Sequence, residues 1–135
     1  MCGICGTFGF SYPLVNEDKL KEMTNTLTHR GPDDSGVFIN GNVGLGHTRL
    51  SIIDLSIAGH QPMQSVDGSV TLIYNGELYN YKELRKILIK KGRSFKSNTD
   101  TEVVLQSYIE WKTDIFSKFE GMFALAIWDS KENTL

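Results

Sequence analysis

The chain has 135 residues, of which 40% are hydrophobic and 22% are charged, proportions typical of one globular domain with its own hydrophobic core. Its formal net charge is −2, and no basic stripe runs along it, so we expect no nucleic acid and no membrane as a partner. No apolar run approaches the ~20 residues of a membrane-spanning helix, and the N-terminus lacks the pattern of a secretory signal.

The first half of the chain predicts a strand, a helix, a loop and a pair of strands, in that order at residues 2–10, 16–27, 29–36 and 35–52. Asn16 is a residue type that caps helices, and the apolar residues after it recur at helical spacing. The dipeptide Asn40-Gly41 favours a tight hairpin turn and therefore joins the two strands.

The second half predicts an irregular stretch, a strand, two helices and a last strand, at residues 53–69, 70–76, 80–92, 99–111 and 121–129. We expect the first of these strands to end at the dipeptide Asn75-Gly76. Asn80 and Thr99 would cap the two helices, since each has a Glu three residues later, and Gly92 would end the first helix. The continuous apolar run of the last strand indicates burial on both of its faces.

This order of elements predicts stacked layers of sheet and helix. Turn residues follow the last strand without a hairpin partner, so we expect the sequence to be an N-terminal piece of a longer protein. Cys2 and Cys5 are its only cysteines. Two cysteines so close together cannot form a disulfide framework, and a reducing, cytoplasmic setting is expected.

Cys2 is chemically the most informative residue, because removal of Met1 would leave it as the first residue. A thiol is a good nucleophile only as a thiolate, and a free cysteine has a pKa of about 8.5. The α-amine of a chain start has a pKa of about 7.7–8.0, so part of it is neutral near pH 7 and can take the thiol proton. Cys2 would then carry nucleophile and base together, and Gly3 places no side chain beside the sulfur.

Other readings of the Cys-x-x-Cys pattern fit less well. A thioredoxin-like redox motif follows a strand, and no strand can precede Cys2. A zinc site needs about four ligands, whereas His29, His47 and His60 stand apart in the sequence. A purely structural role for Cys2 is a stronger competitor, because free cysteine is often buried. For Cys5 the structural role is the better interpretation.

A thiolate that attacks a carbonyl needs donors for the developing oxyanion. The Asn75 side chain and the Gly76 backbone N–H are candidates, although an ordinary Asn-Gly hairpin turn is the better explanation of the pair taken by itself. An α-amino acid substrate would need an arginine for its carboxylate, for which Arg49 and Arg30 are available. Its ammonium would need carboxylates, which Glu77 and Asp100 offer, with helix capping as the alternative role of Asp100.

Six ordered motifs, spread along nearly the whole chain, resemble one family. The sequence is similar to the N-terminal glutaminase domain of glutamine-hydrolysing asparagine synthetases, in the segments MCGICG, HRGPDDSG, HTRLSIIDLSIAGHQPM, YNGELYNYKELR, SNTDTEVVLQSY and EGMFALAIWD. The resemblance implies an α+β fold, the N-terminal-nucleophile hydrolase four-layer αββα sandwich of two mainly antiparallel sheets. It implies one glutaminase domain over residues 1–135, truncated at its C-terminal end and without the synthetase domain.

The resemblance also implies residue roles. Cys2 would attack the side-chain amide of glutamine and form a γ-glutamyl thioester, while Asn75 and Gly76 hold the oxyanion. Arg49 would bind the α-carboxylate and Glu77 with Asp100 the α-ammonium, and Arg30 would support the site without reacting. The implied substrate-binding set is Arg49, Leu50, Ser51, Ile52, Ile53, Asn75, Gly76, Glu77 and Asp100.

The implied partners are L-glutamine and a C-terminal synthetase domain, which would use ATP and Mg²⁺ to convert aspartate to asparagine. The glutaminase step itself needs no cofactor and no metal. A homodimer is one option for the assembly. The segment TRLSIID distinguishes the chain from the related phosphoribosyl and glucosamine-phosphate enzymes, and Cys2 distinguishes it from β-lactam synthetases. An amidotransferase with another acceptor, for example in surface polysaccharide synthesis, and a non-catalytic glutamine-binding module stay open as alternatives.

Overall fold

A computed structural model describes residues 2–10, 15–52 and 54–135. Met1, residues 11–14 and Ile53 lie outside this described part. Along the chain the elements are β1 (Gly3–Phe8), α1 (Glu17–Asn25), β2 (Asp34–Asn40), β3 (Val43–Arg49), the 3-10 helix η1 (Ile57–Gly59), β4 (Met63–Gln64), β5 (Val70–Leu78), α2 (Tyr81–Lys90), α3 (Asp100–Trp111), the 3-10 helix η2 (Lys112–Ser117) and β6 (Gly121–Asp129).

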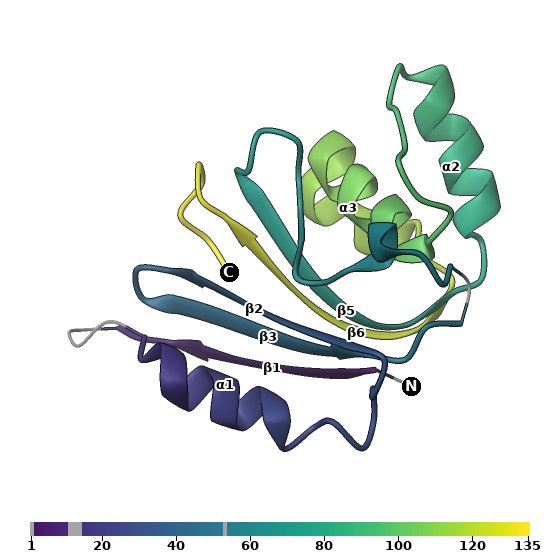
Figure 1. Ribbon diagram of the computed structural model, residues 1–135. Coiled ribbons are helices and arrows are strands. Elements are labelled where there is room, and N and C mark those ends of the chain that lie inside the picture. The colour runs from purple at the N-terminus through teal and green to yellow at the C-terminus, as the bar shows by residue number, and fades with distance from the viewer. Residues whose placement is uncertain (1, 11–14, 53) are drawn as a thin grey trace.

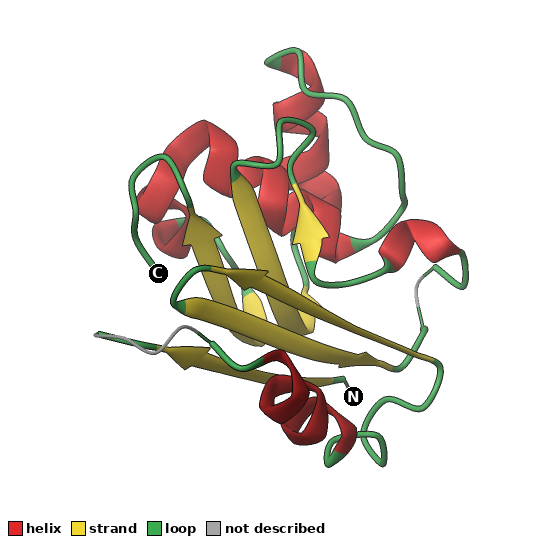
Figure 2. Ribbon diagram, turned by 60° about the vertical axis from the view of Figure 1, so that its left-hand side comes forward, coloured by secondary structure: helices red, strands yellow, loops and turns green. Residues whose placement is uncertain are grey.

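The strands form two antiparallel sheets that face each other. Their strand orders are β1-β3-β2 and β4-β5-β6. Helix α1 covers the outer face of the first sheet, and α2 and α3 cover the outer face of the second (Figure 1). The turned view in Figure 2 likewise places the helices outside the pair of sheets. The predicted four-layer αββα sandwich is therefore confirmed.

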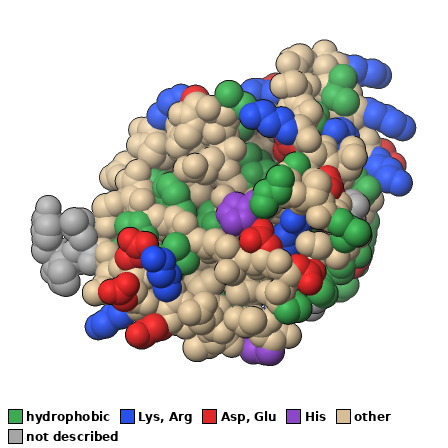
Figure 3. Space-filling model, in the orientation of Figure 1, with side chains coloured by type: hydrophobic (Ala, Val, Ile, Leu, Met, Phe, Trp, Pro, Cys, Tyr) green, Lys and Arg blue, Asp and Glu red, His purple; other side chains and the backbone are tan. Residues whose placement is uncertain are grey.

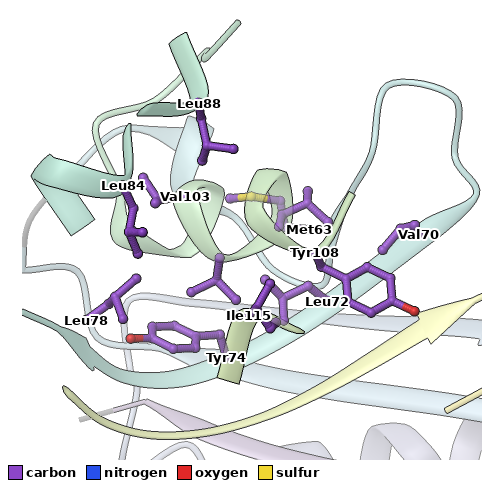
Figure 4. Close-up of a cluster of buried hydrophobic side chains, with 12 residues drawn as sticks. Met63, Val70, Leu72, Tyr74, Leu78, Leu84, Leu88, Val103, Tyr108 and Ile115 are labelled. Atoms are coloured by element: carbon purple, nitrogen blue, oxygen red, sulfur yellow. The ribbon is translucent and has the colours of Figure 1, made fainter. Parts of the chain in front are cut away.

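Two hydrophobic clusters hold these layers together. The larger one lies between the second sheet and its helices and includes Leu72, Leu88 and Ile115, all fully buried (Figure 4). The smaller one, between the sheets, contains Ile73 and Trp128 together with two residues of β3. Because side chains alternate along a strand, β5 sends Leu72 to the helices and Ile73 to the opposite sheet. Strand β5 is thus covered on both faces.

Several local predictions are confirmed. The side chain of Asn16 accepts a hydrogen bond from the Lys19 backbone N–H at 2.9 Å and caps α1. Gly41 has φ +58° in the turn between β2 and β3, a left-handed conformation that glycine adopts without strain. The Thr99 hydroxyl accepts from the Glu102 N–H at 3.2 Å and caps α3. These positions are set by local backbone chemistry.

Other predictions are wrong in detail. The side chain of Asn80 does not cap α2: its amide donates to the Lys118 carbonyl at 2.8 Å and accepts from the Glu120 N–H at 3.2 Å, which ties the start of α2 to the segment before β6. Strand β6 is not buried on both faces, since Met122 is 66% exposed where no described element covers it. The stretch predicted as irregular contains η1 and β4.

Helix α2 presents a solvated basic face, on which Lys82, Lys86 and Lys90 are exposed. Leu84 and Leu88 are buried against the core, whereas Ile87 is 45% exposed. Lys and Arg side chains gather around this helix at the upper right of Figure 3. In the part of the chain with described coordinates, no helix is both long and apolar enough to cross a membrane.

Candidate active site

A cavity of about 340 Å³ opens between the ends of the two sheets and the start of α3. It is bordered by Cys2 directly before β1, by Arg49 from β3, and by Asn75 and Gly76 from β5. Its full lining is Cys2, Arg49, Leu50, Ile52, Asp54, Gly59, Gln61, Tyr74, Asn75, Gly76, Glu77, Leu78, Tyr79, Tyr81, Thr99, Asp100 and Thr101. Residues far apart in the sequence therefore meet around one hollow.

Cys2 is half-buried and free, directly before β1. Its sulfur accepts a hydrogen bond from the Leu50 backbone N–H at 3.4 Å, and the Nε of Arg30 donates to its carbonyl at 3.0 Å. Arg30 thus anchors the main chain of Cys2 without lining the cavity. Cys5 lies elsewhere, with its sulfur 3.4 Å from the Thr24 hydroxyl of α1, which agrees with the structural role predicted for it.

Asn75 and Gly76 do not form a hairpin turn, so the prediction that the strand ends there is wrong. Strand β5 continues to Leu78, and Gly76 pairs with Phe123 of β6. A Cβ atom at Gly76 would lie only 2.4 Å from the Met122 carbonyl oxygen. Glycine is required here because β6 approaches β5 closely, and the ordinary turn explanation of this dipeptide is excluded.

A buried hydrogen-bond network fixes the main chain directly before Asn75. The Gln61 side chain accepts from the Tyr74 N–H at 2.6 Å and donates to the Tyr74 carbonyl at 3.1 Å. This amide continues the pairing of β4 with β5, in the register that joins Met63 to Leu72. Nε2 of His47 lies 3.2 Å from the same carbonyl. Burial lowers the pKa of His47 to about 4, so its ring is neutral at pH 7.

The cavity carries opposite charges at different places. Arg49 is 7% exposed, and its guanidinium donates to the carbonyls of Ser56, at 2.8 Å, and Asp54. Within the described residues no carboxylate forms an ion pair with Arg49. A buried cation without an anionic partner is costly, so this position favours an anionic ligand group. The three remaining guanidinium N–H donors suit a carboxylate.

Asp100 lies at the first position of α3 and is 5% exposed. One of its oxygens accepts from the Tyr74 hydroxyl and from the Leu78 N–H, both at 3.1 Å, and the other accepts from the Thr101 N–H at 2.9 Å. Burial raises the pKa of Asp100, and these hydrogen bonds oppose the rise. The exposed Glu77 also borders the cavity, so two carboxylates lie on this side.

The structure brings together most of the predicted site residues. Leu50 and Ile52 line the cavity with the others, but Ser51 does not: it borders a separate hollow, and its N–H donates to the Asp33 carboxylate at 2.7 Å. Ile53 lies outside the described residues. Sequence reasoning missed the contributions of Asp54, Gly59, Gln61 and Tyr74. Only their place inside the recognised motifs could have indicated them, because their contacts arise from the fold.

Across residues 2–10, 15–52 and 54–135, no three His, Cys, Asp or Glu side chains come together as metal ligands. The polar side chains of the cavity instead carry one thiol, one guanidinium, amide groups, carboxylates and the hydroxyls of threonines and tyrosines. Such a set can hold a zwitterion and attack a carbonyl carbon next to it.

Comparison with known proteins places the chain among its relatives. Residues 1–135, the whole chain, match the family described as "Glutamine amidotransferase domain". The chain belongs to this family. Over its whole length it is 47% identical to asparagine synthetase [glutamine-hydrolyzing] 3 of Bacillus subtilis and spans 22% of that protein. It is 39% identical to a putative asparagine synthetase [glutamine-hydrolyzing] 2 of Methanocaldococcus jannaschii, again over the whole chain, and spans 29% of it.

The chain therefore spans less than a third of the length of these relatives and corresponds to their N-terminal glutaminase domain. This agrees with the resemblance drawn from the six motifs. Among solved structures, the glutamine phosphoribosylpyrophosphate amidotransferase of B. subtilis superposes with a TM-score of 0.76. That match has 19% identity and covers 96% of this chain and 35% of the other. At this identity the likeness concerns the fold, and it supports the N-terminal-nucleophile sandwich.

Proposed function

We propose that this glutamine amidotransferase domain hydrolyses L-glutamine to glutamate and ammonia, with Cys2 as the nucleophile after removal of Met1. One observation carries the proposal: a single cavity collects the Cys2 thiol, the Asn75 and Gly76 pair, the unpaired Arg49 guanidinium and the carboxylates of Glu77 and Asp100. These groups match, one for one, the amide, carboxylate and ammonium of free glutamine.

In the proposed reaction, the free α-amine of Cys2 takes the thiol proton, directly or through one water molecule. The sulfur then attacks the side-chain amide carbon of glutamine, and the amide side chain of Asn75 and the N–H of Gly76 stabilise the oxyanion. The C–N bond breaks, and the nitrogen leaves as ammonia with the proton held by the amine. Water next adds to the thioester carbon, returns a proton to the sulfur and releases glutamate.

The remaining residues would select the substrate. Arg49 would bind the α-carboxylate, and Asp100 with Glu77 the α-ammonium, which also favours the ionised form of the buried Asp100. Leu50 and Ile52 would form the wall of the pocket beside the sulfur. For Ser51 and Ile53 the family resemblance is the only support for a substrate contact, and Arg30 would hold the main chain of Cys2 in place.

We further propose that the ammonia serves a C-terminal synthetase domain that uses ATP and Mg²⁺ to convert aspartate to asparagine. The names and greater lengths of the relatives support this. The chain after β6 already turns back, since Asp129 and Thr134 exchange two backbone hydrogen bonds, at 3.0 and 3.2 Å. A reduced nucleophilic thiol fits the cytoplasm, and a homodimer stays a prediction.

The proposal is tested with the full-length protein after its N-terminal methionine has been removed. We expect it to release glutamate from glutamine, and we expect Cys2→Ala to lower the rate by about 10⁴-fold or more, because no covalent intermediate can form. Cys5→Ala is the matched control and should keep the activity. Turnover that survives Cys2→Ala, or no turnover by the folded wild-type protein, would rule the proposal out.

A further inference from the structure

The carboxylate of Asp54 joins the two charged sides of the cavity, although nothing in the proposed reaction requires it. Its Oδ1 accepts from the Ser56 N–H at 2.9 Å, and its Oδ2 accepts from the Asn98 N–H at 3.1 Å. Asp54 borders the cavity and is half-buried. One side chain thus links the segment after β3 to the segment before α3, which is 44 residues further along the chain.

The segment from Asp54 to Gly59, which Asp54 helps to fix, holds the guanidinium of Arg49 in place. The guanidinium donates to the backbone carbonyls of Asp54 and Ser56. A Cβ atom at Gly59 would lie 2.1 Å from Nη2 of Arg49, so the guanidinium occupies the space that any other residue at position 59 would fill. The position of Arg49 is therefore defined by Asp54, Ser56 and Gly59 together.

On the other side, Asp54 holds the start of α3. Its partner Asn98 immediately precedes Thr99, the capping residue of the helix, and lies two positions before Asp100. The orientation of Asp100 depends on where this first turn lies, because its oxygens accept from both Leu78 and Thr101. A shift at Asn98 would therefore move Asp100 relative to β5.

We propose that Asp54 is a positioning residue that sets the separation between Arg49 and Asp100, and thereby makes the site specific for α-amino acids. This inference rests on the proposed function. In an α-amino acid the ammonium and the carboxylate are attached to one carbon atom, so their separation is fixed. We call Arg49 and Asp100 the two clamps, for the carboxylate and the ammonium. When the clamps are already held at the matching separation, they bind both groups at once and no protein segment has to become ordered on binding. Asp54 supplies this preorganisation.

Asp54 is ionised throughout the working range of such an enzyme. Hydrogen bonds from Ser56 and from the Asn98 N–H lower its pKa to about 2. Because the pKa in the folded protein is depressed, ionised Asp54 stabilises the folded state. This contribution is complete above the ordinary pKa of about 4 and is lost only as the pH falls toward 2. Both hydrogen bonds are thus charge-assisted at neutral pH.

The test uses full-length, Met-free protein with Asp54→Asn and Asp54→Ala. Asparagine retains one acceptor oxygen and alanine retains none, so we expect the KM for glutamine to rise about 10-fold or more in Asp54→Ala, by less in Asp54→Asn, and kcat to change less than about threefold. The inhibition constants of 4-carbamoylbutanoate, which lacks the ammonium, and 4-aminobutanamide, which lacks the carboxylate, should change little, because each analogue uses only one clamp.

Asp67→Asn is the matched control. Asp67 also accepts from the backbone N–H two residues on, that of Ser69 at 3.1 Å, but it lies in the β4–β5 turn away from the cavity. The rate at which iodoacetamide, a small reagent that needs neither clamp, alkylates Cys2 should be the same in all variants, which reports an intact nucleophile site.

Three results would overturn the inference. An unchanged KM in both Asp54 variants would show that no positioning takes place. A selective loss of 4-aminobutanamide binding would show that Asp54 contacts the ammonium itself. A changed alkylation rate of Cys2, together with equal losses for glutamine and both analogues, would show a general structural role. Failure of the wild-type protein to hydrolyse glutamine would instead defeat the proposed function, and this inference with it.

Discussion

The two sheets contribute to the cavity in different ways. The first sheet provides Cys2 directly before one strand and Arg49 at the last position of another, and both are held by groups outside regular structure. The second sheet provides Asn75 and Gly76 from within β5, whose main chain is fixed by buried hydrogen bonds to Gln61.

This difference suits the chemistry proposed for each side. Donors to an oxyanion are most effective when they are already in place before the charge develops, which requires a rigid strand. A nucleophile at a chain start needs access to the substrate, and an arginine held by loop carbonyls binds one end of the substrate without taking part in the bond changes. We therefore expect changes at Asn75 and Gly76 in the second sheet to act on kcat or on stability, and changes at Arg49 in the first sheet to act on substrate binding.

The largest of the remaining effects is expected from Asn75→Ala. Loss of one oxyanion donor costs about 10²–10³-fold in kcat, with a smaller change in KM, because the donor acts mainly in the transition state. Steady-state assays of glutamate release measure this effect. Asn40→Ala, at the last position of β2 before the turn to β3, is the control. A raised KM with unchanged kcat would place Asn75 in ground-state binding instead.

Arg49→Lys should have the next largest effect and the opposite signature. The charge remains, but the planar donors that suit a carboxylate are lost, and charge-assisted hydrogen bonds contribute about 1.5–3 kcal/mol. We expect the KM for glutamine to rise about 10- to 100-fold while kcat changes little. If kcat falls and KM is constant, Arg49 does not bind the α-carboxylate, and the contrast between the sheets fails.

His47 lies on β3 of the first sheet, and its contact with the Tyr74 carbonyl of β5 makes the packing of the two sheets sensitive to pH. Its folded-state pKa of about 4 lies below the ordinary 6.5, so its contribution to stability is complete above pH 6.5 and is lost as the pH falls toward 4. Between pH 7.5 and 5 this loss is about 2 kcal/mol. The variant His47→Gln retains a donor for the Tyr74 carbonyl but has no imidazole to protonate. Between these two pH values, the free energy of unfolding measured in urea should fall by that amount more in the wild type than in His47→Gln. Equal pH dependence would contradict a buried neutral imidazole.

The smallest effect on substrate binding is expected from Thr99, which caps α3 beside the cavity. Thr99→Ala removes the cap of α3 and should lower the free energy of unfolding by about 1 kcal/mol. Because Asp100 follows directly, a modest rise in the KM for glutamine should accompany this loss. A stability loss without any change in KM would show that α3 can fray without moving Asp100.

Much of the fold could be predicted from the sequence because local rules decide it. The cap residues Asn16 and Thr99, the turn at Gly41 and the apolar periodicity of the helices depend only on neighbouring residues. Asn75-Gly76 was misread for the same reason: the pair is a common turn signal, and only the approach of β6 shows why Gly76 is needed within a strand. Asn80 likewise resembles a cap but serves a contact 38 residues away.

The residues of the candidate site also fall into two groups, those that can be found from the sequence and those whose role depends on the fold. Cys2 could be proposed from its chemistry, since few other residue types attack a carbonyl. For the carboxylate, chemistry left both Arg49 and Arg30 as candidates, and the family resemblance selected Arg49. Gln61 and Asp54 could not be proposed in this way, because an amide or a carboxylate in a loop has many roles. Their function follows from partners that the fold brings close: the main chain of β5 for Gln61, and the start of α3 for Asp54.

The central claim is that Cys2 faces a pocket shaped for free glutamine, and covalent labelling tests it most directly. The full-length, Met-free protein is treated with a diazoketone analogue of glutamine, and the modified peptides are mapped by mass spectrometry. We expect one adduct, on the sulfur of Cys2, that excess glutamine prevents and that Cys5 does not share. Labelling of Cys5, absence of labelling, or labelling that glutamine does not suppress would contradict it.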